Sequence, residues 1–68
     1  MSKENYKPLP SFHGSEAEYQ SAVMDMAKAI FNTVGRNHVE AELKRRAPQL
    51  VQSGVNIAHV QDTLRHRF

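Results

Sequence analysis

Apolar residues recur at helical spacing through most of the chain, and this pattern predicts helices rather than strands. The first apolar stripe contains Val23, Ala27, Ile30 and Val34, which are four, three and four residues apart. Ser15 and Glu18 before it form a capping-box pattern, in which their side chains bond the free N–H groups of a helix start. Gly35 suits a helix end, so we expect the longest helix at 15–34.

A second stripe follows, made of Val39, Leu43, Ala47 and Leu50. Asn37 and Glu40 form another capping-box pattern at its start. Pro48 interrupts the stripe, and proline is tolerated at a first helical position but costly inside a helix. We therefore expect two helices, 38–46 and 48–53, with a single kinked helix as the alternative. The side chains expected to face water here are Glu40, Glu42, Lys44 and Arg45.

The stretch from residue 49 to residue 64 predicts a helix, a tight turn and another helix. Gly54 fits the position just past a helix end, where the backbone is left-handed, and Val55 can fold back onto Leu50. Asn56 is a strong N-cap for the next helix, and Val55 and Val60 flank it at the spacing of a hydrophobic staple. These residues predict a sharply defined corner between two helices.

The last helix is expected at 57–67. Its inward side is predicted to carry Ile57, Val60, Leu64 and Phe68. Its outward side is predicted to carry His59, Gln61, Asp62, Arg65 and His66. The predicted fold class is therefore all-α, a small bundle of three to four short helices with a helix-turn-helix-like corner at Gly54.

Residues 1–14 differ from the rest because prolines and a glycine break any helical period. We expect an extended or disordered N-terminal arm at 1–14 and a helical domain at 15–68. Tyr6, Leu9 and Phe12 are three residues apart, so a polyproline-like segment would present them on one side. They can then hold the arm against the domain or against a partner.

The composition indicates a small cytoplasmic protein. With 68 residues and no cysteine, the chain has no disulfide framework, and a domain of this size is marginally stable without a partner. We find no signal-peptide pattern and no apolar run long enough for a membrane span, so we expect no membrane association. Residues 1–34 carry three lysines and four carboxylates, whereas residues 35–68 carry six basic residues and three carboxylates. The basic half therefore contains the corner.

The residues that could support catalysis or ligation are sparse. His59 and His66 are seven residues apart, about 10.5 Å along a helix, which is too far for both to bind one ion. The chain has no glycine-rich phosphate loop, and its length leaves little room for a concave pocket. We therefore expect no enzyme activity, no metal, no cofactor and no small-molecule substrate.

The segment 48–64 resembles the helix-turn-helix of DNA-binding proteins at Gly54, Val55 and Val60. It departs from that pattern at three core positions, which are Leu50, Ser53 and Thr63. The resemblance implies that the last helix enters the major groove of DNA. The implied base contacts are Asn56, Gln61 and Arg65, and the implied phosphate contacts are Lys44, Arg45, Arg46 and Arg67. The leading functional hypothesis is a DNA-binding regulator.

The alternative hypothesis is a non-enzymatic protein-interaction module, an adaptor or an inhibitor of a larger intracellular protein. Met24 and Phe31 widen the apolar face of helix 15–34 beyond what one short helix covers, so this face can bind another protein or a second copy. The arm supplies three further candidate interface residues, Tyr6, Leu9 and Phe12. Under either hypothesis we expect a homodimer.

Overall fold

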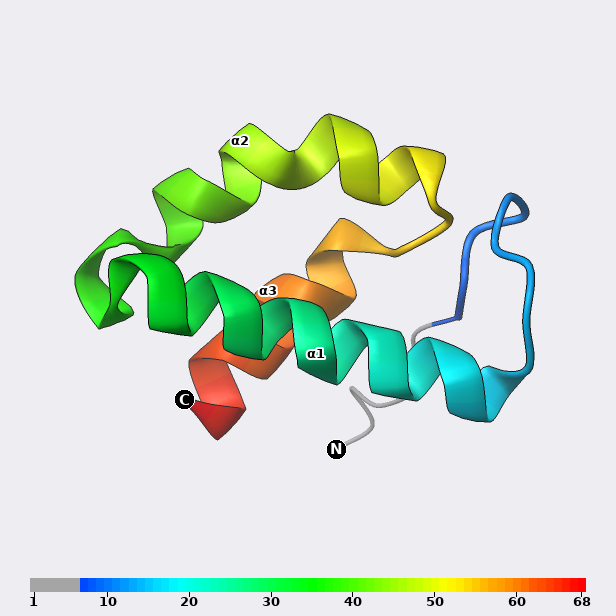
Figure 1. The fold of residues 1–68 in the computed structure, drawn as a ribbon, viewed down its shortest axis with the longest axis horizontal. Helices are drawn as coiled ribbons and strands as arrows, with labels where there is room; N and C mark the ends of the chain where they lie inside the picture. The colour runs from blue at the N-terminus through cyan, green and yellow to red at the C-terminus, as the bar shows by residue number, and fades with distance from the viewer. Residues whose placement is uncertain (1–6) are drawn as a thin grey trace.

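The computed structural model describes residues 7–68, which form three α-helices and one short 3-10 helix (Figure 1). In chain order the elements are α1 (Glu16–Val34), η2 (Arg36–His38), α2 (Val39–Gln52) and α3 (Ile57–Arg67). The described residues contain no strand, which confirms the predicted all-α class for this part of the chain. Tyr6, one of the candidate interface residues, lies outside the described residues.

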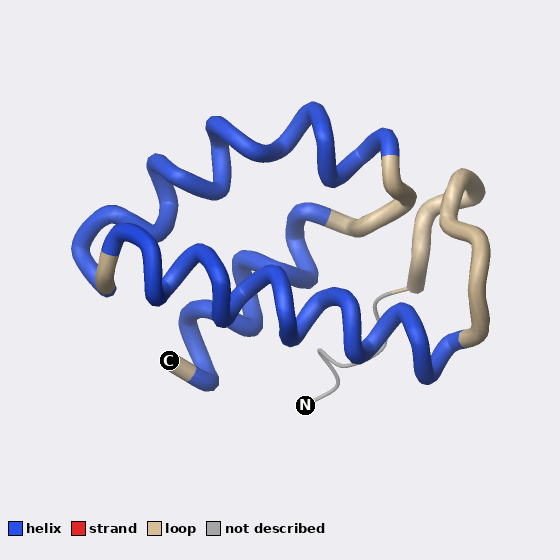
Figure 2. The backbone as a smooth tube through the Cα atoms, in the orientation of Figure 1, coloured by secondary structure: helices blue, strands red, loops and turns tan. Residues whose placement is uncertain are grey.

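The three helices form a flat molecule. α1 and α2 run in opposite directions. In the view of Figures 1 and 2, α3 crosses behind α1 from the α2–α3 turn towards the C-terminus. The Cα atoms extend over 31 × 28 × 15 Å, so the molecule is thin in one direction and every helix keeps one face at the surface. The core is consequently small. The shape of the space between each pair of helices therefore helps to determine what the surface can bind.

The buried core joins all three helices and the turn between the last two. Its hydrophobic members are Tyr19, Val23, Ala27, Ile30, Leu43, Leu50, Val55, Val60 and Leu64. The stripe predicted for the first helix is therefore buried at 23, 27 and 30, while Val34 at its end is half-buried. Burying apolar surface stabilises a fold by about 25 cal/mol per Å², so these positions hold the helices together.

Both ends of α1 follow the sequence prediction. The N–H of Glu18 donates to the Ser15 hydroxyl at 3.1 Å, and the N–H of Ser15 donates to the Glu18 carboxylate at 2.7 Å. At the other end the N–H of Gly35 donates to the carbonyl of Phe31 at 2.8 Å, with a φ of +80° that favours glycine. The capping box and the terminal glycine explain why this helix occupies these nineteen residues.

The predicted capping box at Asn37 and Glu40 is wrong. An N-cap residue has an extended backbone, whereas Asn37 lies inside the 3-10 turn η2, where the N–H of His38 donates to the carbonyl of Gly35 at 3.2 Å. α2 begins one residue later than predicted, and its N-cap is His38, whose side chain makes no capping hydrogen bond. The 3-10 turn thus takes the place of a side-chain cap.

The predicted division of the second segment into 38–46 and 48–53 is also wrong, because α2 is one continuous helix with Pro48 inside it. Leu43 and Leu50 lie on either side of the proline and are both buried in the same core. Lys44 and Pro48 are exposed, so water can reach the Lys44 carbonyl that the proline leaves without an N–H donor. Tertiary packing therefore overrides the local preference for a break.

Candidate functional site

The turn between α2 and α3 is closed by backbone hydrogen bonds. The N–H of Val55 donates to the Leu50 carbonyl at 2.9 Å, and the N–H of Gly54 donates to the Val51 carbonyl at 3.0 Å. This pair of bonds is the Schellman arrangement of a helix end. Gly54 has a φ of +88°, the left-handed conformation that a side chain disfavours.

The start of α3 is capped by Asn56, as the sequence predicts. The Asn56 side-chain oxygen accepts the N–H of Ala58 at 3.0 Å. Val55 before the cap and Val60 after it are both buried, which is the arrangement of a hydrophobic staple. α3 therefore leaves the turn in a direction fixed by both a polar and an apolar contact.

The described part of the N-terminal arm packs against this turn, and residues 9–12 form a turn of their own (Figure 2). The N–H of Leu9 donates to the Gly54 carbonyl at 2.9 Å, and the Ser11 hydroxyl donates to the Val51 carbonyl at 3.3 Å. A Cβ atom added to Gly54 would collide with the backbone of Phe12. The arm therefore covers the corner, and the glycine is required for this close approach.

Tyr19 links the arm, α1 and α3. Its side chain is fully buried, and its hydroxyl accepts the N–H of Asn56 at 3.1 Å and lies 3.4 Å from the His59 Nδ1. Its ring packs edge-on against Phe12, with a centroid separation of 5.2 Å. Burial raises the pKa of the Tyr19 hydroxyl, and the hydrogen bond from the Asn56 backbone opposes that rise. Tyr19 thus acts as a neutral hydrogen-bonding member of the core.

The prediction that His59 faces water is wrong. Only 8% of this residue is exposed, and its ring lies 5.5 Å from that of Tyr19. The contact of α3 with α1 is wider than the stripe through Val60 and Leu64. It therefore covers the position before Val60 as well. Burial lowers the pKa of His59, with the Asp62 carboxylate opposing, so the folded state favours the neutral imidazole.

The three candidate base-contact residues all lie on or next to α3, and each is engaged within the chain. The Asn56 side-chain oxygen is used in the helix cap. Gln61 is half-buried between α2 and α3. Arg65 pairs with Glu40 of α2 at 3.1 Å, and both side chains are about 60% exposed. An exposed pair of this kind is worth about 0.2 to 1 kcal/mol, so an external anion can replace Glu40.

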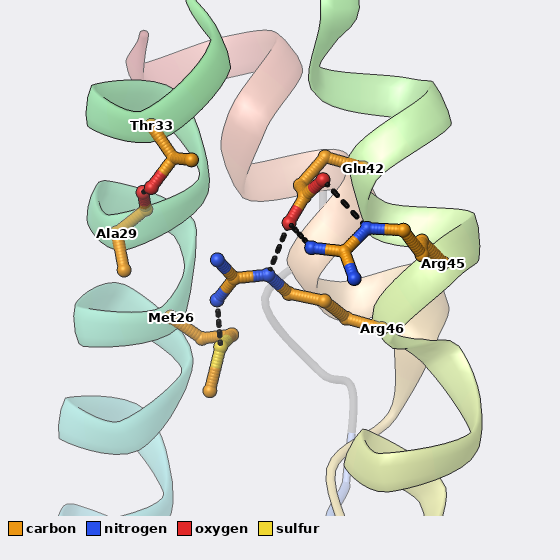
Figure 3. Close-up of polar contacts among 6 residues, drawn as sticks. All are labelled: Met26, Ala29, Thr33, Glu42, Arg45 and Arg46. Carbon is orange, nitrogen blue, oxygen red and sulfur yellow. Dashed lines mark hydrogen bonds and ion pairs between the residues drawn. The ribbon is translucent and has the colours of Figure 1, made fainter.

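Two of the candidate phosphate contacts belong to an ion cluster between α1 and α2 (Figure 3). The Glu42 carboxylate is only 7% exposed and accepts from Arg45 at 2.6 Å and from Arg46 at 2.7 Å. Arg46 also reaches the Met26 sulfur of α1 at 3.8 Å. The prediction that Glu42 faces water is wrong, because the two guanidinium groups in the next helical turn supply the hydrogen bonds that a buried carboxylate requires.

The hydrogen bonds from Arg45, and then those from Arg46, hold the pKa of Glu42 down at about 2. Burial acts in the opposite direction and is outweighed. The Arg46 side chain is 26% exposed, whereas that of Arg45 is 72% exposed. Arg45 can therefore still reach an external anion, while Arg46 lies mainly between α1 and α2, beside a hollow of about 350 Å³.

The four candidate phosphate contacts do not share one face. Lys44 lies beside the space between α2 and α3. Arg67 lines a shallow hollow of about 290 Å³ between α1 and α3, together with Met24. Arg46 faces the third space, between α1 and α2. A polyanion that contacts one face of the protein can therefore bind only some of these four residues at one time.

The candidate protein-interface residues are partly covered within the chain. Phe31 is half-buried and stacks on Phe68, with ring centroids 5.3 Å apart. Phe12 and Leu9 are half-buried at the corner. Met24 is half-buried as well, and it lines the shallow hollow between α1 and α3. Within the described residues, the apolar face of α1 is thus less open than its sequence indicates.

The space between α2 and α3 remains open. Two adjoining hollows of about 460 and 430 Å³ lie along it, and they share Glu40, Leu43 and Gln61. We call this continuous depression the groove. Its apolar lining consists of Val39, Ala41, Leu43, Ala47, Ile57, Leu64 and Phe68. A groove of this composition can seat apolar side chains of a ligand.

Sequence reasoning missed Tyr19 and the groove for different reasons. Tyr19 lies four residues before Val23, so it continues the apolar stripe of α1 and could have been identified. The groove depends on how far α2 and α3 stand apart. Its only sequence signal is the pair of small residues Ala41 and Ala47, which leave space on α2.

Within residues 7–68, no group of three or more histidine and carboxylate side chains lies close enough together to hold a metal ion. In the same range, none of the helices combines the length and apolar content that a bilayer crossing requires. Comparison with protein-family models, curated proteins and solved structures found no match. The groove is the candidate site that the geometry of the chain itself indicates, because its two hollows adjoin and share lining residues.

Proposed function

We propose that this protein is a non-enzymatic protein-interaction module that binds its partner through the groove. One observation carries the proposal: the space between α2 and α3 is left open over two adjoining hollows of about 460 and 430 Å³. The spaces on the other sides of these helices contain smaller, separate hollows, of about 350 Å³ beside Met26 and Arg46 and of about 290 Å³ beside Met24 and Arg67. A concave depression lined largely by apolar residues, with polar groups among them, is typical of a binding site.

A selection experiment with displayed peptides tests this proposal. Ala47 is half-buried in the groove, so Ala47→Gln fills part of it without adding charge, and Ala29→Gln on the exposed side of α1 is the matched control. We expect selected peptides to bind the Ala47→Gln variant at least tenfold more weakly than the wild type and to bind the Ala29→Gln variant equally well.

Ala41→Gln provides a second groove variant at an exposed position, and circular dichroism verifies that each variant folds. Peptides that do not distinguish either groove variant from the wild type would contradict binding through the groove.

DNA binding is the second candidate function, and the turn at Gly54 favours it. Its support is that α2 and α3 are joined by a capped turn and that Gln61 and Arg65 lie one helical turn apart on α3. Binding to mixed duplex DNA at about 50 and about 200 mM salt tests this candidate. Arg65→Ala should weaken the binding, and Arg45→Ala should reduce its salt dependence.

The expected homodimer is a proposal about the hollow between α1 and α3. Met24 lies half-buried there beside Arg67, so a second copy could cover it. We expect a dimer mass in solution for the wild type and a monomer mass for Met24→Gln. A monomer at all concentrations for the wild type would exclude this assembly.

A further inference from the structure

The rim of the groove carries more positive than negative charge. Its cationic side chains are Arg36, Lys44 and Arg65, and its only acidic side chain among the described lining residues is Glu40. Arg36 donates to the backbone oxygen of Phe68 at 2.6 Å. The chain as a whole has a formal charge of +2, so the rim alone carries an excess equal to that of the entire protein. A ligand whose charge complements that of the rim is therefore negatively charged.

Two of these cationic side chains, Lys44 and Arg65, are accessible to an external ligand. Lys44 is exposed on α2. Arg65 is held by a single carboxylate, that of Glu40, and both side chains are largely accessible to solvent. Because such an exposed pair contributes little to stability, a carboxylate from a ligand can take the place of Glu40 at small cost.

The floor of the groove requires apolar contact as well. Leu43 and Leu64 form its base and are already buried, at 4% and 6% exposure, so the apolar surface that a ligand can cover belongs mainly to Val39 and Ile57, which are half-buried. A ligand that is anionic throughout would meet the rim but leave these side chains uncovered. The suitable ligand therefore has one apolar side and acidic flanks.

The length of the groove fits a short helix. α3 forms one wall with eleven residues, which at 1.5 Å per residue is about 16 Å. A partner helix of about three turns spans that distance. Its apolar residues at i, i+4 and i+7 would stand over the two hollows, as in helix-in-groove recognition.

We infer that the groove binds an acidic amphipathic helix of about three turns contributed by another protein. The apolar stripe of this helix lies on Val39 and Ile57, above the buried Leu43. Its flanking carboxylates bind Lys44 and Arg65, and one of them replaces Glu40 as the partner of Arg65. This inference rests on the proposed interaction function and specifies the chemistry of the partner.

Three synthetic peptides of equal length test the inference by fluorescence anisotropy on the full chain. The first is an acidic amphipathic helix, the second carries lysine at every acidic position, and the third is a scrambled acidic peptide without an apolar stripe. We expect the first to bind at least tenfold more tightly than either of the others. Its affinity should fall as salt increases, because the rim charges are exposed.

Charge reversal locates the binding. Lys44→Glu at the rim should lower the affinity for the acidic peptide at least tenfold. Lys28→Glu on the exposed side of α1 should leave that affinity within about twofold of the wild type. Both are Lys→Glu changes at exposed helical positions, so they alter the net charge equally. Equal weakening by the two variants would show general attraction and overturn the inference.

The outcomes separate this inference from the proposed function. If the lysine peptide binds as tightly as the acidic one and Ala47→Gln weakens both, the groove is a binding site but its preference for acidic partners is wrong. If none of the three peptides binds and displayed peptides do not distinguish Ala47→Gln, both proposals fail. If the acidic peptide binds but Lys44→Glu has no effect, its site lies elsewhere and the inference fails.

Discussion

The corner and the groove meet at the start of α3, where Asn56 belongs to the first and Ile57 to the second, yet the chain covers one of them and leaves the other open. At the corner, Leu9 and Phe12 cover Gly54, and Tyr19 supplies the acceptor for the N–H of Asn56. In the groove, apolar side chains of α2 and α3 face each other without an element between them. One region is completed by the chain itself, and the other is left open.

The difference between the corner and the groove shows which residues stabilise the fold and which remain available to bind a ligand. Tyr19 and Gly54 cannot change without disturbing several contacts, because each meets atoms from distant parts of the chain. Lys44 and Ala41 meet few such atoms and are exposed. Substitutions at the corner should therefore reduce stability, whereas substitutions in the groove should reduce binding. The following predictions test that division.

The largest expected effect is that of Gly54→Ala. The added Cβ would collide with the backbone of Phe12, and the residue would be held at a φ of +88°. The left-handed conformation alone costs about 1 to 2 kcal/mol, and displacement of the arm adds to this, so we expect a loss of about 2 to 4 kcal/mol. Urea denaturation monitored by circular dichroism measures it.

Gly35→Ala is the control for Gly54→Ala. Gly35 also has a positive φ, of +80°, but an added Cβ would meet no atom within 4 Å. We expect a loss of about 1 to 3 kcal/mol from backbone strain alone. If the two substitutions cost the same, the arm does not press on Gly54 as the structure indicates.

Tyr19→Phe should have the next largest effect. It keeps the ring beside Phe12 but removes the hydroxyl that accepts the N–H of Asn56. A buried donor without a partner costs about 1 to 3 kcal/mol, and we expect a loss in the lower half of that range. Thermal unfolding should show the change. An unchanged stability would mean that the N–H of Asn56 finds another acceptor.

Glu42→Gln should change how stability depends on pH. The pKa of Glu42 is about 2 in the folded protein, below its ordinary value of 4.5, so the ionised group stabilises the fold above about pH 4.5. That contribution is lost as the pH falls from about 4.5 towards about 2. The wild type should therefore lose stability in this window, and the variant should lose less. Urea midpoints at several pH values measure the difference.

A surface variant serves as the control for Glu42→Gln. Glu40→Gln removes an exposed ion pair with Arg65 and should change stability at pH 7 by less than about 1 kcal/mol. If it costs as much as Glu42→Gln at that pH, the cluster between α1 and α2 has no special role in the fold.

The smallest effect on stability is expected for Ala41→Gln in the groove. Ala41 is exposed, so we expect a change within about 0.5 kcal/mol, while binding of groove-directed peptides falls at least tenfold. Urea denaturation measures the change in stability, and fluorescence anisotropy on the same sample measures the change in peptide affinity. A large loss of stability together with intact binding would reverse the proposed division between corner and groove.

The candidate site was less predictable than the helices. Sequence reasoning located Arg65 and Lys44, which the structure places at the rim of the groove. The spacing of Arg45 and Arg46, three and four residues after Glu42, could have predicted their ion pairs within one helix. Sequence reasoning could not show that Glu42 is buried, because that requires α1 to stand beside α2. Nor could it show that the phosphate candidates lie on different sides of the molecule.

The sequence by itself determined where α1 begins and ends and where α3 begins. Ser15 with Glu18, Gly35 and Asn56 act through hydrogen bonds to residues at most four positions away, so they operate before any tertiary contact forms. Gly54 belongs with them as a helix end, since its bond to Val51 is equally local.

Only the tertiary structure decided the continuity of α2 through Pro48, the burial of Glu42 and His59, and the docking of the arm. Each depends on groups that are distant in sequence. Leu43 and Leu50 hold both halves of α2 against the shared core, and Tyr19 brings the arm and α3 together. The groove belongs to the same class, because its width depends on how α2 and α3 pack and not on either helix alone.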